Sequence, residues 1–231
     1  MGIMKNRFSY KGLALIELLV ALVLFGMVAA GIYRLFIAQN TAYVVQEQVV
    51  EVQQNIRSAM EILLRDIRMA GFDDDNTGSA ITITNPIVYP VNADSITVDY
   101  EYYDKSTLQY QRHTVAYWLD VPSSSLVRQP TVNAVGGPQE VLLENVETLS
   151  FAYGADQNGD GVMDDLNGNG VIDDGDWILA ANVGTRKVIA VRVTLTARPA
   201  QVNSPSEVQK MVMPRTLTSA ITLRNLCLTK L

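Results

Sequence analysis

An apolar run close to the N-terminus is the most pronounced pattern in the chain. Residues 13–32 carry one charged side chain, Glu17, and are otherwise almost entirely apolar. At about 1.5 Å per residue, a helix of this length crosses a bilayer core of about 30 Å. A carboxylate inside such a span is costly, and for that reason it points to a function.

A second helical pattern follows directly. Gln and Glu side chains alternate with apolar residues that recur every three or four positions: Val45, Val49, Val52, Ile56, Met60, Leu63 and Ile67. This spacing is typical of an amphipathic helix. Because residues 13–70 contain no proline, we expect a single helix, with a transmembrane half (13–36) and an amphipathic half (37–70). Gly71 is the expected helix stop.

From residue 81 onward the period of alternation changes to two, which indicates β-strands. A turn is expected at 104–106 and a Gly/Pro-bearing loop at 133–138. A final segment, 212–221, contains Pro214 and is expected to form at most an edge or irregular strand. The other predicted strands are 81–84, 96–102, 108–112, 114–119, 125–128, 141–143, 148–153 and 188–197.

Residues 1–12 form a short basic leader that ends in Gly12. A secretory signal peptide would have a shorter apolar region without Glu and would be followed by an A-x-A cleavage site. A plain membrane anchor leaves Glu17 unexplained. The pattern KGLALIELLVAL of residues 11–22 closely resembles the leader motif of type IV prepilins, and this resemblance accounts for both the glycine and the glutamate.

The resemblance implies a role for each residue of the motif. A prepilin peptidase would cleave between Gly12 and Leu13, and the new amine of Leu13 would be methylated. Glu17 would then be the fifth mature residue and would serve assembly by pairing with the N-terminal amine of a neighbouring subunit. Leu13 replaces the usual Phe, so the extent of methylation stays open. The alternative to this pairing is that the Glu17 carboxylate reaches the lipid headgroups or is protonated.

Segment 63–72 resembles the end of the helix in PilW-type minor pilins. Segments 141–153 and 186–197 resemble PilW-type proteins and also the J-type minor pseudopilins of type II secretion. The resemblance implies an α+β, type IV pilin-like fold, in which the long N-terminal helix packs on an antiparallel β-sheet domain of residues 71–231. It implies a single-pass protein of the inner membrane, with a cytoplasmic N-terminus and a periplasmic domain, that later enters the pilus at the cell surface.

The function implied is that of a non-catalytic minor pilin in the priming and assembly of type IV pili, with downstream roles in adhesion, twitching motility or DNA uptake. Its partners would be the prepilin peptidase, other minor pilins, the major pilin and the inner-membrane assembly platform. Two alternatives stay open: a minor pseudopilin of a type II secretion system, and a membrane-anchored calcium-dependent adhesin or binding module.

Composition excludes several other classes. The formal net charge is −6 and no basic stripe suggests nucleic-acid binding. His113 is the only histidine, and a hydrogen-bonded strand histidine is a better interpretation than a catalyst. No nucleophile elbow, phosphate loop or Cys/His zinc set accompanies it. We therefore expect no enzymatic activity.

An acidic segment, 156–176, contains seven Asp and no Lys or Arg. Calcium takes roughly six to eight oxygen ligands, and tightly turning loops supply them. The pattern D-x-N-x-[DN]-G-V-x-D occurs twice, from Asp156 and again from Asp165, as in the compact calcium loops of dockerin-like and thrombospondin type 3 repeats. The candidate ligands are Asp156, Asn158, Asp160, Val162 (carbonyl) and Asp164 in the first frame, and Asp165, Asn167, Asn169, Val171 (carbonyl), Asp173 and Asp176 in the second.

These frames predict a structural calcium ion. Without an ion, so many like charges repel one another, and the alternative is a flexible acidic insertion that binds no fixed ion.

Overall fold

The computed structural model describes residues 15–73, 81–90, 94–199 and 213–227, and it divides into two compact units, Met1–Glu47 and Gln48–Leu231. Helix α1 (Leu15–Arg68) begins in the first unit and ends in the second. In the first unit, every described residue up to position 40 is exposed. This part of α1 includes an 18-residue stretch with a mean hydropathy of 2.6, which is apolar enough to cross a membrane.

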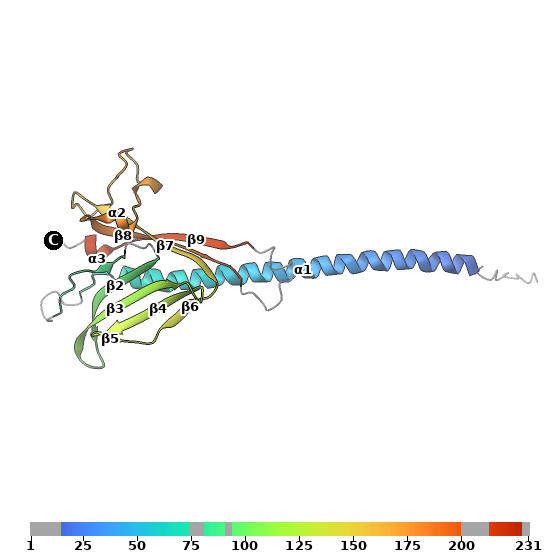
Figure 1. Cartoon of the computed structure of the whole chain (residues 1–231), viewed down its shortest axis with the longest axis horizontal. Helices are drawn as coiled ribbons and strands as arrows, with labels where there is room; N and C mark the ends of the chain where they lie inside the picture. The colour runs from blue at the N-terminus through green and yellow to red at the C-terminus, as the bar shows by residue number, and fades with distance from the viewer. Residues whose placement is uncertain (1–14, 74–80, 91–93, 200–212, 228–231) are drawn as a thin grey trace, which may run out of the picture. The chain divides into compact units, whose positions relative to one another are not determined.

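Within the second unit, the described strands form two antiparallel sheets (Figure 1). The larger sheet has the order β1-β2-β3-β4-β5, with β6 paired to β4. The smaller sheet has the order β7-β8-β9. Their bounds are β1 (Ile87–Val88), β2 (Ser95–Asp104), β3 (Gln109–Asp120), β4 (Ser125–Val132), β5 (Val135–Gly136), β6 (Glu140–Leu143), β7 (Val146–Asp156), β8 (Lys187–Ala197) and β9 (Arg215–Thr222). Short helices η1 (Asp174–Asp176), α2 (Ala180–Val183) and α3 (Arg224–Cys227) complete the described elements.

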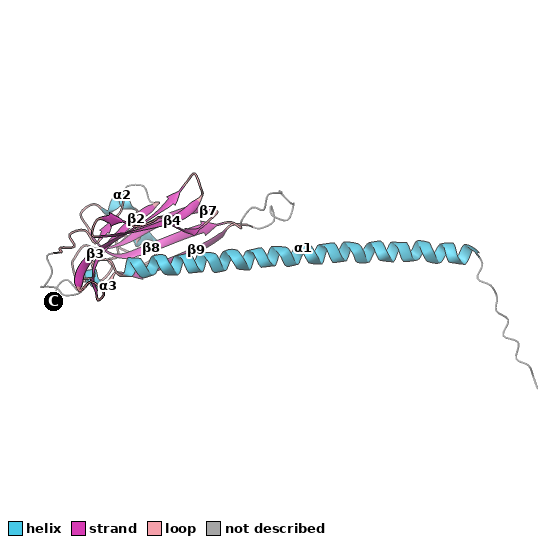
Figure 2. Ribbon diagram, turned by 90° about the horizontal axis from the view of Figure 1, so that it is seen from below, coloured by secondary structure: helices cyan, strands magenta, loops and turns pink. Residues whose placement is uncertain are grey.

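The last turns of α1 lie against both sheets and supply one side of the hydrophobic core (Figure 2). The predicted stripe is the buried one, because Val52, Ile56, Met60, Leu63 and Ile67 are all inaccessible to solvent or nearly so. Burying a side chain of this size contributes about 1.5–3 kcal/mol. The sheets cover these residues with Ile96, Val98, Val115, Tyr117, Leu149, Phe151, Val191, Val193 and Leu195. The stripe therefore makes this part of α1 an integral element of the second unit.

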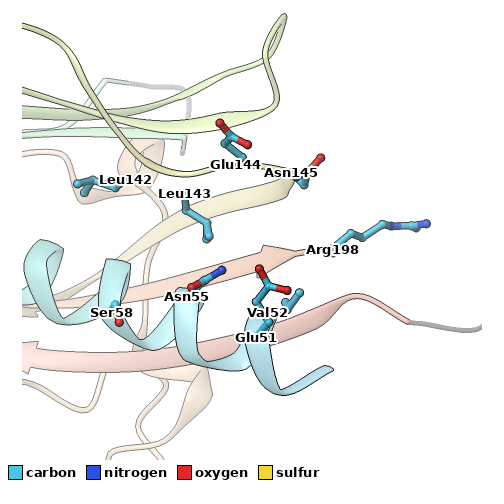
Figure 3. A pocket seen from close by; sticks show the side chains of 9 residues that line it. All are labelled: Glu51, Val52, Asn55, Ser58, Leu142, Leu143, Glu144, Asn145 and Arg198. Carbon is cyan, nitrogen blue, oxygen red and sulfur yellow. The ribbon is translucent and has the colours of Figure 1, made fainter. Parts of the chain in front are cut away.

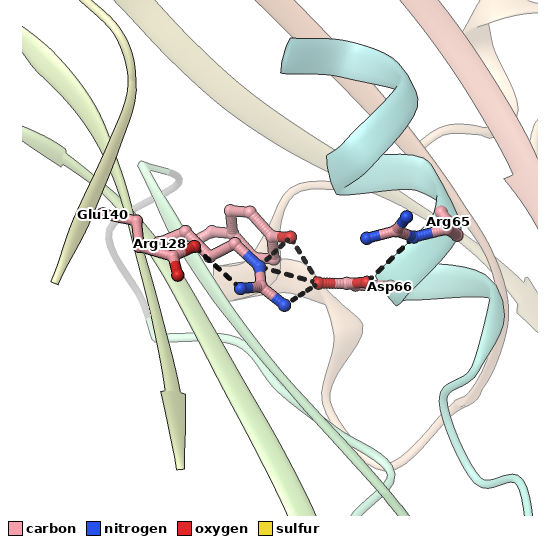
Figure 4. Close-up of polar contacts among 5 residues, drawn as sticks. Arg65, Asp66, Arg128 and Glu140 are labelled. Atoms are coloured by element: carbon pink, nitrogen blue, oxygen red, sulfur yellow. Dashed lines mark hydrogen bonds and ion pairs between the residues drawn. The ribbon is translucent and has the colours of Figure 1, made fainter. Parts of the chain in front are cut away.

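A buried polar network also joins α1 to the larger sheet (Figure 4). The Asp66 carboxylate, 5% exposed, accepts hydrogen bonds from the Tyr117 hydroxyl at 2.7 Å and from Nε of Arg128 at 2.9 Å. Arg65 approaches the same carboxylate at 3.5 Å, and Arg128 also pairs with Glu140 on β6. Burial and the bond to Asp66 raise the pKa of Tyr117, which stays a neutral donor. The network fixes the position of the helix on strands β3 and β4.

The predicted α+β fold is confirmed. The predicted end of the helix, one turn and one edge strand also agree with the structure. Gly71 has φ +69°, and a Cβ there would lie 2.6 Å from the Leu226 side chain, so this position requires glycine at the end of the helix. The turn after β2 and the edge position of β9 also agree with the prediction.

Other strand predictions were wrong in detail. Residues 81–84 form no strand, although Ile81 and Ile83 are half-buried and the threonines between them are exposed. Pro86 follows closely, and proline restricts the preceding residue and lacks an N–H for a ladder. The predicted strands 108–112 and 114–119 are one continuous strand, β3.

Part of the predicted loop 133–138 is the short strand β5. Val132 pairs with Val135, and both residues between them, Asn133 and Ala134, have positive φ. This is the backbone of a two-residue type I′ hairpin, which Asn-Ala signals less strongly than Asn-Gly does.

Candidate functional site

The N-terminal part of α1 presents an uninterrupted apolar surface around a single carboxylate. Glu17 lies in the first described turn of the helix, where the helix dipole favours a negative charge. Its neighbours Leu15, Ile16, Leu18 and Leu19 are all more than half exposed. The predicted cleavage and methylation positions, Gly12 and Leu13, lie outside the described residues. A surface this apolar needs lipid or protein around it to be stable.

The acidic segment 156–176 joins β7 to β8 and folds as two equivalent turns. In the first frame, the Asp156 carboxylate accepts hydrogen bonds from the backbone N–H groups of Gly159 and Gly161. The Oδ1 atom of Asn158 accepts from the N–H of Asp160 at 2.8 Å, and Oδ1 of Asp160 accepts from the N–H of Val162 at 2.8 Å. Each polar side chain thus fixes the backbone two to five residues ahead of it.

The second frame repeats this geometry nine positions later. Asp165 accepts from the N–H groups of Gly168 and Gly170. Asn167 accepts from the N–H of Asn169, which in turn accepts from the N–H of Val171. The first glycines have φ +76° and +74°, and the second glycines +84° and +85°. The match in both hydrogen bonds and dihedral angles shows that the repeated sequence encodes a repeated structure.

Asparagine amides link the remaining carboxylates in both frames. Nδ2 of Asn158 lies 3.1 Å from Oδ2 of Asp160 and 3.1 Å from Oδ1 of Asp164. In the second frame, Nδ2 of Asn167 and Nδ2 of Asn169 donate to the two oxygens of Asp173. An N–H donor between carboxylates offsets part of their repulsion, as a bound cation would.

Asp176 closes the second turn and is fully buried as a residue. Its carboxylate accepts from the backbone N–H groups of Leu166, Asn167 and Asp173, and the bond from Asp173 is the main cause of its lowered pKa. Asp173 reciprocates by capping η1. The position that an EF-hand loop gives to a bidentate ligand is therefore occupied here by a carboxylate that binds backbone amides.

The acidic segment is docked on the smaller sheet. The N–H of Asp164 donates to the carbonyl of Ala155, and Arg192 on β8 pairs with Asp174 and lies 4.8 Å above the Trp177 ring. A Cβ on Gly154 would lie 2.6 Å from the sulfur of Met163, so Met163 packs directly on β7. Glycine is required where the sheet and the loop approach so closely.

Side-chain hydrogen bonds bring part of each predicted ligand set together: Asn158, Asp160 and Asp164 in the first frame, and Asn167, Asn169 and Asp173 in the second. Across the described ranges, no group of three His, Cys, Asp or Glu side chains has an arrangement that holds a metal ion. The oxygen atoms of the two frames belong to carboxylates, amides and carbonyls, which is the donor chemistry that a hard cation such as calcium prefers. The oxygen atoms of the two frames therefore suit calcium. In the structure, the carboxylate oxygens accept hydrogen bonds from nearby Asn amides and backbone N–H groups instead.

His113 lies on β3 between two tyrosines of β2. Its ring stacks on Tyr100 at 5.2 Å and meets the edge of Tyr102 at 6.2 Å. Burial lowers the pKa of His113, and the nearby Asp104 opposes this effect. The Nε2 atom is buried and has no hydrogen-bond partner among the described residues, so the expectation of a hydrogen-bonded strand histidine is not met at this atom.

A polar pocket of about 330 Å³ lies beside α1, on the flank that faces the β6–β7 connection (Figure 3). Glu51 and Asn55 approach it from the helix, and Glu144 lies across from them. Arg198 also lines the pocket and forms an ion pair with Glu147. No local sequence pattern marks this pocket, because its lining residues come from three distant segments.

Comparison with known proteins supports the interpretation of the N-terminal segment as a methylation motif. A family model described as the prokaryotic N-terminal methylation motif matches residues 7–33. Among solved structures, the type IV-like pilin TTHA1219 from Thermus thermophilus is similar, with 12% sequence identity and a TM-score of 0.49, over 76% of this chain and 98% of that chain. None of the curated proteins matches the chain significantly. The chain carries a prokaryotic N-terminal methylation motif that runs into an apolar helix long enough to cross a membrane.

Proposed function

We propose that this chain is a non-catalytic minor pilin of the PilW type, which takes part in the priming and assembly of type IV pili. The observation that carries the proposal is the match to the methylation motif at residues 7–33, which overlaps the exposed apolar part of α1. The matched residues include Gly12 and Leu13, between which a prepilin peptidase would cleave, and Glu17, which would serve filament assembly.

The chemistry of assembly follows from Glu17. Cleavage after Gly12 leaves a positive amine on Leu13, four residues before the glutamate. In the low dielectric of lipid or of a filament core, an unpaired carboxylate is costly, and pairing with the amine of a neighbouring subunit removes that cost. The exposed leucines and valines of residues 15–37 then bury their surface against other pilins, while the Gln48–Leu231 unit remains outside the membrane.

Processing of the N-terminus tests this proposal. We expect the protein purified from membranes to begin at Leu13 with a methylated amine, and to begin at Met1 in a strain that lacks the prepilin peptidase. Mass spectrometry of the intact chain and of its N-terminal peptide measures both. A Glu17→Ala variant should still be processed but should fail to enter filaments. An intact leader in both strains would refute the pilin proposal and leave a membrane-anchored binding module.

A minor pseudopilin of a type II secretion system would be processed in the same way. Deleting the gene distinguishes the two machines, because loss of pili with normal exoprotein secretion supports the pilus and the reverse supports secretion.

We further propose that segment 156–176 binds calcium as a structural ion. The repeated frames, each with carboxylate and amide oxygens held by the same turn, support this proposal. In the first frame, the ion would replace the Asn158 amide, which now donates to Asp160 and Asp164. In the second frame, it would replace the amides that donate to Asp173. Its role would be to stabilise the surface that the docked segment forms with β7 and β8.

Calcium is therefore expected to raise the thermal midpoint of the Gln48–Leu231 unit. At a concentration about 100 times the dissociation constant, binding adds about 2.7 kcal/mol to the free energy of unfolding. Asp160→Ala, in the first frame, should weaken calcium binding measured by titration calorimetry. Asp174→Ala is the matched control, since Asp174 belongs to neither ligand set and its side chain is 98% exposed. No heat of binding and an unchanged midpoint in calcium would refute this proposal.

A further inference from the structure

Strand β9 is an open edge of the smaller sheet. It pairs with β8 along its whole length, and none of the described strands pairs with its other side. Outside that ladder, the backbone of Arg215–Thr222 makes no hydrogen bond to any described residue. An unpaired edge presents a row of N–H and C=O groups that another extended chain can bind. Apart from Arg215 at its start and Pro214 just before it, β9 carries none of the charges or prolines that usually protect such an edge.

A groove runs between this edge and α1. Two hollows form it, of about 590 Å³ and about 270 Å³, and both are lined by Leu217 of β9 and Arg57 of α1. We call this feature the β9 groove. Apolar side chains from both elements line it, together with four arginines and one acid: Ile56, Met60, Ile62, Leu64 and Leu217 are apolar, Arg57, Arg65, Arg68 and Arg215 are basic, and Glu61 is acidic.

Most of the arginines of the β9 groove have no acidic partner among the residues that the structure describes. Arg57, Arg68 and Arg215 form no ion pair within the described part of the chain, and Arg65 shares Asp66 with the closer Arg128. The whole chain is acidic, with a net charge of −6, so this groove is opposite in sign to the protein that carries it. Clustered like charges repel, and an anionic partner relieves that repulsion.

We infer that the β9 groove is a docking site for an extended acidic segment of a partner protein, which adds to β9 as a further strand. Backbone hydrogen bonds to the edge supply affinity, and alternate side chains supply specificity. Apolar side chains of the segment contact the half-buried Ile62, Leu64 and Leu217, and its carboxylates pair with the arginines. The site lies entirely within the Gln48–Leu231 unit, so the inference stands whether or not the N-terminus is processed.

Two other anionic occupants fit less well. The chain's own acidic segment, in a second copy, is folded into turns, and its carboxylates accept hydrogen bonds from its own backbone. It therefore offers no extended strand. Anionic lipid headgroups match the arginines but leave the N–H and C=O groups of the β9 edge unpaired.

A set of three peptides tests the mode of binding on the full chain in detergent micelles. The first is a fluorescent peptide of about eight residues in which Glu and Val alternate, long enough for one strand. The second replaces Glu by Lys, and the third keeps Glu but is N-methylated at alternate backbone nitrogens. By fluorescence anisotropy, the first should bind at least about tenfold more tightly than either control, because only it offers both negative charge and a backbone free to pair.

A double variant locates the binding site. Arg57→Ala with Arg68→Ala should weaken binding of the Glu/Val peptide by about tenfold or more, since it removes two unneutralised charges from the groove. Lys105→Ala with Arg186→Ala removes the same net charge outside the groove and should change affinity by less than about twofold. Thermal melts of both variants check that they are folded.

Three results would overturn the inference. These are equal affinity for the N-methylated peptide, unchanged affinity in the Arg57/Arg68 double variant, and stronger binding of phosphatidylglycerol vesicles than of the Glu/Val peptide by the same arginines.

Discussion

Replacing Asp66 by alanine is expected to lower the free energy of unfolding by about 3–5 kcal/mol. The substitution leaves the Tyr117 hydroxyl without its acceptor and the largely buried Arg128 guanidinium without its main counter-charge. Breaking a buried pair is costly because the remaining charge stays desolvated. Denaturant titration of the full chain in detergent micelles, followed by the fluorescence of Trp118 and Trp177, measures this loss.

Two further variants separate the buried network from a general charge effect. Glu140→Ala removes the exposed partner of Arg128 and should cost less than about 1 kcal/mol. The triple variant Asp66→Leu, Tyr117→Phe and Arg128→Met replaces the whole network with apolar groups and should recover most of the stability, as buried ion pairs often break even against apolar substitutes. A near-neutral Asp66→Ala variant would mean that the network does not hold α1 on the larger sheet.

Leu63→Ala is expected to destabilise the Gln48–Leu231 unit by about 2–5 kcal/mol, since it leaves a cavity in the core. Leu63 has no exposed surface and lies on α1 between the two sheets. The matched control is Leu22→Ala in the same helix, where the side chain is 65% exposed in the protein. Both substitutions change helix propensity equally, so the difference between them reports packing alone.

The same denaturant titration compares the two leucine variants. Leu22→Ala should leave the unfolding of the second unit unchanged within about 0.5 kcal/mol. Equal destabilisation by the two substitutions would contradict the division of α1 into an exposed part and a core part.

The helix was the most predictable element of the fold. Its apolar span and its amphipathic stripe are local patterns. The structure buries the stripe from Val52 to Ile67, whereas Val45 and Val49 are only half-buried. The loop frames were predictable for a similar reason, because each carboxylate or amide acts on backbone groups only a few residues away, and the second glycine of each frame has the positive φ that its position in the frame requires.

Contacts between distant segments were not predictable. Asp66 follows Arg65 and precedes Arg68 in the sequence, which suggests an exposed turn of helix, and its main partner Arg128 lies 62 positions away. Asp99 and Glu101 of β2 are both buried, although carboxylates in a strand usually face solvent. The Asp99 carboxylate accepts hydrogen bonds from Arg112 and Thr114 of β3. Both carboxylate oxygens of Glu101 lack a hydrogen-bond partner in the part of the chain that the structure describes.

The division of the strands between two sheets has the same origin. Alternation identifies a strand but not its neighbours, and β6 pairs with β4 while β7, which follows it directly, pairs with β8. The β9 groove exists because the second sheet ends beside α1, so no local sequence pattern announces it.

The two frames of segment 156–176 have a consequence for how such chains change over evolutionary time. Most of the hydrogen bonds that shape a frame close within the frame itself. The connection that contains both frames leaves β7 and enters β8 at residues that pair with each other, Asp156 with Lys187. A duplication or deletion of one nine-residue unit therefore lengthens or shortens a surface projection without shifting the register of the sheet beneath it. Relatives of this protein are expected to differ in the number of these units while keeping β7 and β8 unchanged.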